Sequence, residues 1–229
     1  MIFVFGDNGP EASVVDPTGL ASGAFAFDLE VPAGGVRDVV VAIPFEASPG
    51  PPELAGAFGP GPWTGIPEKD ADALFEALLS RERERWRSLL DRVAFDVPAE
   101  AERYVKVLRS QLGWILVNRD GPAIQPGSRS YARSWIRDGS LTSEALLRLG
   151  HGADARSFLL WFSGFQGAGG RVPCCVDARG ADAVPENDSH GQLLFLVAET
   201  VRYTGDRGLA ARMWPRVVAA VSYIDALRQ

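Results

Sequence analysis

Between two apolar segments of this chain stands the sequence Pro126-Gly127-Ser128-Arg129-Ser130-Tyr131-Ala132-Arg133-Ser134-Trp135-Ile136-Arg137-Asp138-Gly139. Ordinary connections are short and consist of small turn residues. This one instead carries several arginines, a tyrosine, a tryptophan and an aspartate. Arginine supplies planar hydrogen-bond donors, aspartate supplies acceptors, and tryptophan supplies a flat apolar face. The stretch therefore predicts a binding site for a polar ring compound such as a sugar.

A second polar loop follows later, Val184-Pro185-Glu186-Asn187-Asp188-Ser189-His190-Gly191. Its two carboxylates stand two positions apart, just before an apolar segment that predicts a helix. Asp188 or Ser189 could cap that helix through a side-chain oxygen. Glu186 is less easily explained as a cap, so this loop also predicts a role in binding.

Loop lengths predict that the two stretches meet. Hydrophobic periodicity predicts helices over 99–118, 138–150, 153–165, 190–203 and 214–228, with a short helix over 206–213 and Pro215 in the first turn of the last one. The links 119–137 and 166–189 are long, whereas the link 150–152 is short. Because consecutive antiparallel helices alternate in direction, both long links should lie at one end of the helical array, where a site belongs.

Composition excludes several classes of partner. The formal net charge is −6, which argues against a general nucleic-acid partner or an anionic membrane surface, because both favour a basic face. No apolar run has the length of a membrane span. The N-terminal residues 1–7 are too short and too acidic for a signal peptide, so we expect a cytoplasmic protein.

The chain contains only two cysteines, Cys174 and Cys175, and they are adjacent. Their number excludes a disulfide framework. The simplest interpretation is two small, partly buried residues. A zinc site that adds His190 lacks the ordinary ligand spacing, so we expect neither a metal nor a cofactor.

The N-terminal part predicts a different structure. Residues 1–60 are β-rich, with strand patterns over 23–31 and 36–45 and a turn at Gly34-Gly35. Two or three strands do not form a stable sheet alone, so this part either packs on the helices that follow or ends a larger β domain, and we favour the second. A Pro- and Gly-rich linker over 48–67 precedes a long helix over 68–93, in which 81–85 reads as a self-paired charged surface. The predicted regions are 1–60 (β-sandwich-like), 61–97 (linker with a long helix) and 98–229 (helical array).

Trp135-Ile136-Arg137-Asp138 resembles the Trp-x-Arg-Asp motif of the six-hairpin glycosidases, particularly their bacterial glucoamylase-like members. In that family the motif opens the second helix of an (α/α)6 barrel, and a Pro-x-x-Asp-type stretch, similar to 185–191, opens the fourth. Those members also carry a β-sandwich and a helical linker, which residues 1–93 resemble. The resemblance implies a mostly α fold: a partial (α/α)6 toroid of about five barrel helices, preceded by a β-sandwich remnant and a linker helix.

The resemblance also implies a function. It predicts a glycoside hydrolase-like protein of carbohydrate metabolism that binds the non-reducing-end sugar of an α-glucoside-type oligosaccharide, hydrolysed with inversion. In the family the general acid follows the fifth barrel helix and the base lies later. We therefore expect this chain to be a fragment that lacks both, with exposed barrel helices that favour self-association.

The expected substrate-binding residues come from both loops, and each has a plainer alternative. Asp138 is either a sugar ligand or an N-cap, Trp135 a stacking surface or core, and His190 a contact or a brace. Tyr131 and Arg133 are weaker candidates for binding, with bracing of the loop as the alternative for both. Gln166 and Arg171 are rim candidates, and Glu186 is also a secondary catalytic candidate. The full set of expected binders is Tyr131, Trp135, Arg137, Asp138, Glu186, Asp188 and His190.

Two other functions stay open. The chain could be a carbohydrate-binding or structural fragment of a six-hairpin protein that performs no hydrolysis. It could instead be a lyase, an epimerase or a zinc-dependent cyclase on an α/α toroid. The two histidines and the single Cys-Cys pair offer little for that chemistry.

Overall fold

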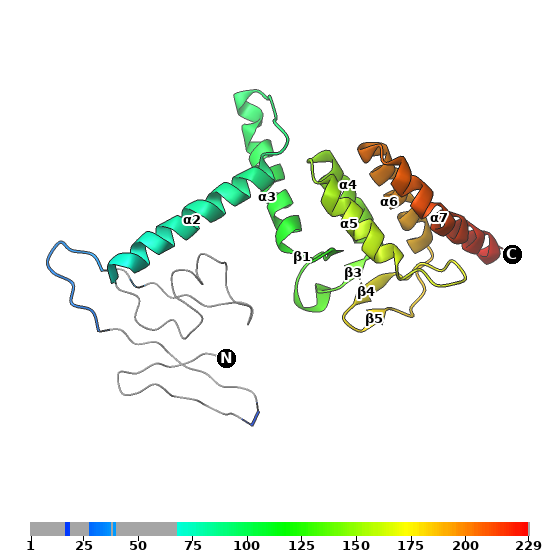
Figure 1. Cartoon of the computed structure of the whole chain (residues 1–229), viewed down its shortest axis with the longest axis horizontal. Helices are drawn as coiled ribbons and strands as arrows, with labels where there is room; N and C mark the ends of the chain where they lie inside the picture. Colours follow the sequence, from blue (N-terminus) through cyan, green and yellow to red (C-terminus); the bar gives the residue numbers. More distant parts are fainter. Residues whose placement is uncertain (1–16, 19–27, 38, 40–67, 229) are drawn as a thin grey trace. The chain divides into compact units, whose positions relative to one another are not determined.

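The structure is a computed structural model that describes residues 17–18, 28–37, 39 and 68–228 (Figure 1). The chain divides into two units, Met1–Arg81 and Glu82–Gln229, and each is described by itself. The described residues are mostly helical, with two small antiparallel sheets. This confirms the predicted mostly α class.

The first unit contains the predicted turn. The amide of Gly35 donates to the carbonyl of Pro32 at 2.8 Å, and Gly34 has a φ of +75°, a conformation that glycine adopts without steric cost. The predicted strands and the linker over 48–67 lie largely outside the described residues, so the β-sandwich remnant stays a prediction.

The helix α2, Glu68–Leu90, agrees with the predicted long helix. Its charged segment pairs with itself, since Arg85 Nε lies 2.8 Å from Glu82 Oε2 three residues earlier, with both side chains exposed. The prediction of a solvated, self-paired helix surface is therefore confirmed for this pair.

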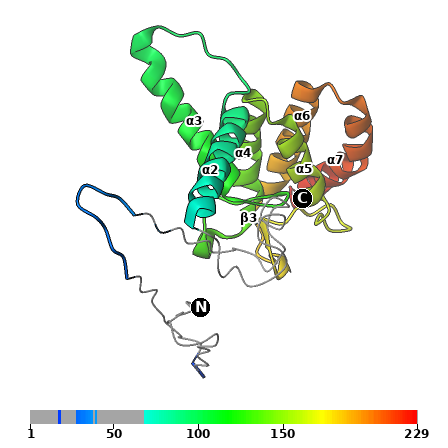
Figure 2. The ribbon, with the colours of Figure 1, turned by 60° about the vertical axis from the view of Figure 1, so that its left-hand side comes forward.

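The second unit is a layered helical array. Helix α4 packs against both α5 and α6, and α6 packs against α7, as Figures 1 and 2 show. Because α4 and α6 begin at the same end, they run parallel, and α5 returns between them. The helices of this unit are α3 (Glu102–Val117), α4 (Ile136–Arg148), α5 (Gly152–Ser163), α6 (Ser189–Thr204) and α7 (Arg207–Leu227), with 3₁₀ turns at Ala99–Ala101 and Arg129–Tyr131.

The core lies between these layers. Phe158 and Phe162 of α5 are fully buried together with Leu146 of α4 and Leu196 of α6. Gly139 allows α4 to approach α5, because a Cβ atom at this position would lie 2.1 Å from Cζ of Phe158. The glycine that ends the first polar stretch is therefore required by packing.

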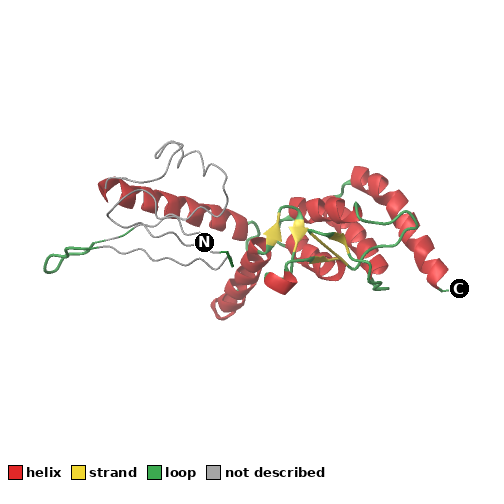
Figure 3. Ribbon diagram, turned by 90° about the horizontal axis from the view of Figure 1, so that it is seen from below, coloured by secondary structure: helices red, strands yellow, loops and turns green. Residues whose placement is uncertain are grey.

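The two long links join in one small sheet, drawn among the yellow strands of Figure 3. Strand β3 (Ser134–Trp135) comes from the first link and pairs antiparallel with β4 (Cys175–Asp177) of the other, which also pairs with β5 (Gly180–Ala181). A separate hairpin joins β1 (Arg119–Asp120) to β2 (Ala123–Ile124). The prediction that both links lie at one end is confirmed. The strands were not predicted, because two or three residues show no detectable alternation.

The C-terminal prediction was wrong in one respect. In place of a short helix followed by a second one, α7 runs without a break from Arg207 to Leu227, with Pro215 in its interior. An interior proline costs about 3 kcal/mol. Buried Leu209 and Met213 before it and Ala220 after it hold both halves against the same layer, which offsets that cost.

Asp206 caps α7, because its Oδ1 accepts a hydrogen bond from the Leu209 amide at 2.8 Å.

Within the described part of the chain, none of the helices combines the length and apolar character needed to cross a bilayer.

Candidate functional site

The guanidinium group of Arg137 joins the two polar loops. Its Nε donates to Oδ2 of Asp188 at 2.7 Å, and its Nη2 donates to Oδ1 of Asp188 at 2.9 Å and to Oε2 of Glu186 at 2.6 Å. The hydrogen bonds to Asp188 raise the pKa of Arg137, and the same contact lowers the pKa of Asp188. The structure therefore brings Arg137, Glu186 and Asp188 together in one group of ion pairs, here called the Arg137 cluster.

The Arg137 cluster lies where two parallel helices begin. Ser140 Oγ of α4 donates a hydrogen bond to Oε1 of Gln192 of α6 at 2.6 Å. This bond joins the two helices near their N-terminal ends. A helix N-terminus carries a partial positive charge that stabilises nearby carboxylates. The first turn of α4 contains Asp138, and Asp188 is the N-cap residue of α6. Both helices thus direct positive ends toward the acidic residues of the site.

The positions of Asp138 and Asp188 in their helices test whether these residues act as N-caps. The N-cap residue of α4 is Trp135, so Asp138 lies inside the first turn and is not the cap. Asp188 does occupy the cap position of α6, but its side chain makes no capping hydrogen bond. Its carboxylate instead binds Arg137. Asp138 is partly buried and, among the described residues, makes no side-chain hydrogen bond or ion pair.

Trp135, two positions before Arg137, is partly buried, and its ring has neighbours from its own loop. The guanidinium carbon of Arg133 lies 5.5 Å from its ring centroid, and the ring of Tyr131 lies 6.3 Å away at a tilt of 50°. Tyr131 itself is 62% exposed. The aromatic pair therefore leaves apolar ring surface partly exposed on the loop that leads into Arg137.

Arg133 braces the two links. Its Nε lies 3.0 Å from Oδ2 of Asp177, and its Nη2 donates to Oδ2 of Asp182 at 2.5 Å. Hydrogen bonding to Arg179, a second arginine on the same loop, holds the pKa of Asp177 at about 2. This pairing agrees with the bracing alternative for Arg133. Its acidic partners were missed because they lie 44 and 49 residues away, with no local signal.

His190 is buried against α7. It is 2% exposed, and its ring stacks on Tyr223 of α7, with centroids 4.5 Å apart and an interplanar angle of 11°. Its Nδ1 lies 3.3 Å from the carbonyl oxygen of Asn187. Its position is that of the bracing alternative, since it joins the second loop to α7.

The two rim candidates of the link 166–189, Gln166 and Arg171, form hydrogen bonds with backbone carbonyl groups. The side-chain amide of Gln166 donates to the carbonyls of Gly170 and Arg216, at 3.1 and 3.0 Å. Arg171 donates to the carbonyl of Ala183 at 2.6 Å. Both side chains therefore hold the link in place.

The cysteines lie in the interior beside the site. Cys174 and Cys175 are free and buried, with their sulfur atoms 3.4 Å apart. Burial raises the pKa of the Cys175 thiol to about 12. No group of three or more His, Cys, Asp or Glu side chains among the described residues is arranged to hold a metal ion.

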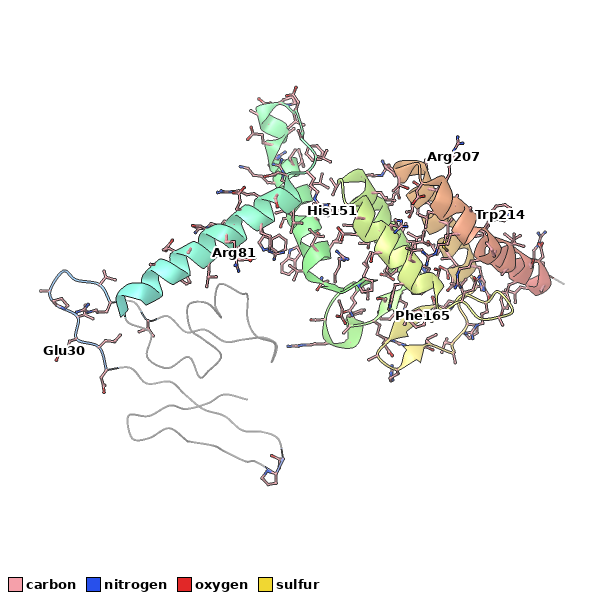
Figure 4. All side chains as sticks on the ribbon, viewed as in Figure 1. Glu30, Arg81, His151, Phe165, Arg207 and Trp214 are labelled. Carbon is pink, nitrogen blue, oxygen red and sulfur yellow. The ribbon has the colours of Figure 1, made fainter. Side chains whose placement is uncertain are left out.

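A second charged cluster lies at the other end of the helices and was not predicted. His151 is fully buried, with Nδ1 3.0 Å from Oδ2 of Asp154 and Nε2 2.9 Å from the carbonyl oxygen of Leu89. Asp154 also pairs with Arg119 at 2.5 Å. Figure 4 shows His151 and Phe165 at opposite ends of α5. Because His151 links α5 to the last turn of α2, this cluster is a structural one.

Comparisons of the chain with protein-family models, curated proteins and solved structures gave no match.

Proposed function

We propose that this chain is a glycoside hydrolase-like protein of carbohydrate metabolism that binds the non-reducing-end sugar of an α-glucoside-type substrate. The observation that carries the proposal is the Arg137 cluster. Arg137 pairs with Glu186 and Asp188 where α4 and α6 begin, and Trp135 and Asp138 flank it within two positions in the chain. The residues that resemble the family motifs thus lie together in space.

The cluster has the chemistry that a sugar requires. Carboxylate oxygens accept hydrogen bonds from sugar hydroxyls, and such charge-assisted bonds are stronger than neutral ones. Asp138 and the remaining lone pairs of Glu186 are the acceptors we assign to the ligand, with Trp135 as the stacking surface. Arg137 already makes three hydrogen bonds to the two carboxylates, so its role is to hold them in place.

The arrangement of the helices supports the fold that this function implies. In an (α/α)6 toroid, alternate helices run parallel in one layer and the helices between them return in another. The parallel neighbours α4 and α6, with α5 packed on both of them, have the relationship expected of consecutive hairpins in such a toroid. We propose the partial toroid on this basis.

The same cluster favours binding over catalysis by these residues. A general acid needs a proton at working pH, and its pKa is usually raised. The pKa of Asp188 is lowered by Arg137, so this group stays a carboxylate at neutral pH. Asp188 is therefore not suited to be the general acid, and the family resemblance places both the acid and the base later, in a longer protein. A non-catalytic carbohydrate-binding fragment is the second candidate, and the pairing of both carboxylates with Arg137 favours it.

Titration with an iminosugar tests the proposal. We expect the wild-type chain to bind it and Arg137→Gln to lose at least tenfold in affinity, measured by calorimetry. Arg148→Gln is a matched control, because Arg148 also lies on α4 and pairs with Glu144 at the opposite end of the helix. Absence of binding to wild type, or equal losses in both variants, would reject the site. Release of p-nitrophenol from an aryl α-glucoside separates hydrolysis from binding.

A further inference from the structure

The two cysteines depart from the usual geometry of neighbouring residues in extended backbone. Successive side chains of a strand point to opposite faces. Cys174 immediately precedes β4 and Cys175 begins it, yet their sulfur atoms lie 3.4 Å apart. Both side chains are buried, at 4% and 1% exposure. The backbone therefore directs both thiols to one place, where each sulfur is the other's neighbour.

We propose that Cys174 and Cys175 are a vicinal dithiol that a peroxide oxidises reversibly to an intramolecular disulfide. The chain has no other cysteine, so an internal disulfide within one molecule can join only this pair. The sulfurs are already in contact, so bond formation needs a closer approach of these two atoms and a rotation of the peptide between them.

The reaction balances with hydrogen peroxide as the oxidant. One sulfur attacks the peroxide, the O–O bond breaks, and a sulfenic acid and one water form. The second thiol then attacks the sulfenic sulfur, the S–O bond breaks, and a second water leaves as the S–S bond forms. Together the sulfurs lose two electrons and two protons, and the peroxide is reduced to two waters.

Burial of the thiols slows this reaction. The pKa of Cys175 is raised to about 12, chiefly by loss of hydration, so this sulfur is almost wholly a thiol at neutral pH. The thiolate is the nucleophile in thiol chemistry. Disulfide formation should therefore be slow at neutral pH and faster in mildly alkaline solution, and large alkylating reagents should be excluded from the folded protein.

The disulfide is expected to be easily reduced. Adjacent Cα atoms are about 3.8 Å apart across a trans peptide, whereas bridged cysteines usually have Cα atoms about 4.4–6.8 Å apart. A bridge between neighbours is therefore strained, and strained disulfides belong to the labile, regulatory kind. This geometry indicates a switch that reduction resets.

The switch would act on the start of α4. The carbonyl oxygen of Cys174 accepts a hydrogen bond from the amide of Ile136 at 3.0 Å, and that of Cys175 accepts one from Asp182 at 2.9 Å. A disulfide between adjacent cysteines closes a small ring, and this rotates the peptide group between them. That peptide contains the carbonyl of Cys174, the acceptor of the Ile136 amide. Ile136 stands between Trp135 and Arg137, so oxidation should loosen the backbone that holds both.

Mass spectrometry of the intact chain tests the bond. Treatment with hydrogen peroxide at mildly alkaline pH should remove two hydrogens from wild type, and a dithiol reductant should restore them. Cys174→Ser and Cys175→Ser should show no such loss, while circular dichroism confirms that they fold. A wild-type chain that stays reduced, gains only sulfinic or sulfonic oxygens, or forms only cross-linked dimers would overturn the proposal.

Amide hydrogen exchange tests the coupling. The Ile136 amide should exchange at least several-fold faster in the oxidised chain than in the reduced one, whereas amides in the middle of α5 should not change. Equal exchange at Ile136 in both states would overturn the link to α4. Neither measurement uses a sugar, so these results do not depend on the proposed function.

Discussion

Nη2 of Arg137 lies 2.6 Å from Oε2 of Glu186, although the two residues are 49 positions apart in the chain. Their contact is made possible by the parallel starts of α4 and α6, and it converts two separate polar loops into one acidic site. With Asp188 included, the cluster holds two carboxylates on one guanidinium group.

The first prediction concerns the pH dependence of stability. The pKa of Asp188 in the folded chain is below its ordinary value, because it accepts hydrogen bonds from Arg137. The pair therefore stabilises the fold above the unfolded-state pKa of about 3.9, and this contribution is lost as pH falls through the lower folded-state pKa. Asp188→Asn should lower the melting temperature at neutral pH, by an amount that shrinks toward zero in acid.

Thermal unfolding of wild type and Asp188→Asn across a pH series measures this difference. Because the Asp188 side chain is 41% exposed, the effect should be small and should weaken with added salt. A difference that is constant down to the most acidic condition would contradict the assignment of the shift to this pair.

The second prediction concerns the close contact between α4 and α5. Gly139→Ala would place a methyl group 2.1 Å from Cζ of Phe158, in the fully buried core. Overpacking of this kind costs about 1–3 kcal/mol. Urea unfolding should show the loss, and Phe158→Leu in the same chain should recover part of it.

Gly191→Ala provides the matched control. Gly191 is also a helical glycine, in α6, but nothing lies within 4 Å of the position of a new Cβ atom. Alanine there should be neutral or stabilising by up to about 1 kcal/mol. Equal losses for the two substitutions would show that the Phe158 contact is not the cause.

The third prediction concerns the brace formed by Arg133. Arg133→Gln removes the ion pairs to Asp177 and Asp182 that hold the first link against the other. Amide exchange in β3 and β4 should become faster, while exchange in the middle of α6 stays the same. Arg179→Gln is the control, because Arg179 also pairs with Asp177 but is 81% exposed and does not reach the first link. Similar changes in both variants would assign the effect to Asp177 alone.

Some of this structure follows from local sequence patterns. Apolar residues recur at helical spacing in α2, α3, α4, α5 and α6, so their positions agree with the predicted ones to within a few residues. The meeting of the two loops also followed, since it requires only that successive helices reverse direction. The carboxylates of Glu186 and Asp188 were recognisable because they precede an apolar segment.

Other features depend on distant contacts that leave no local pattern. The pairing of Trp135 with Cys175 involves strands too short to alternate visibly. The bracing of Arg133 depends on acidic residues in another link, and the burial of His151 depends on a carbonyl in α2. Proline favours the first turn of a helix, so Pro215 predicted a new helix start. The helix α7 is instead continuous through Pro215, because residues on both sides of the proline are buried.

The last prediction follows from that helix. The nitrogen of Pro215 cannot donate to the carbonyl of residue 211, so α7 lacks one hydrogen bond of its ladder. Pro215→Ala should restore the bond and stabilise the chain by roughly 1–3 kcal/mol, reduced by the greater freedom that alanine gives the unfolded chain. Val218→Ala, at an exposed position one turn later, should change stability by no more than about 1 kcal/mol. Urea midpoints give both values, and a loss of stability in Pro215→Ala would mean that the proline bends α7 to fit the layer beneath it.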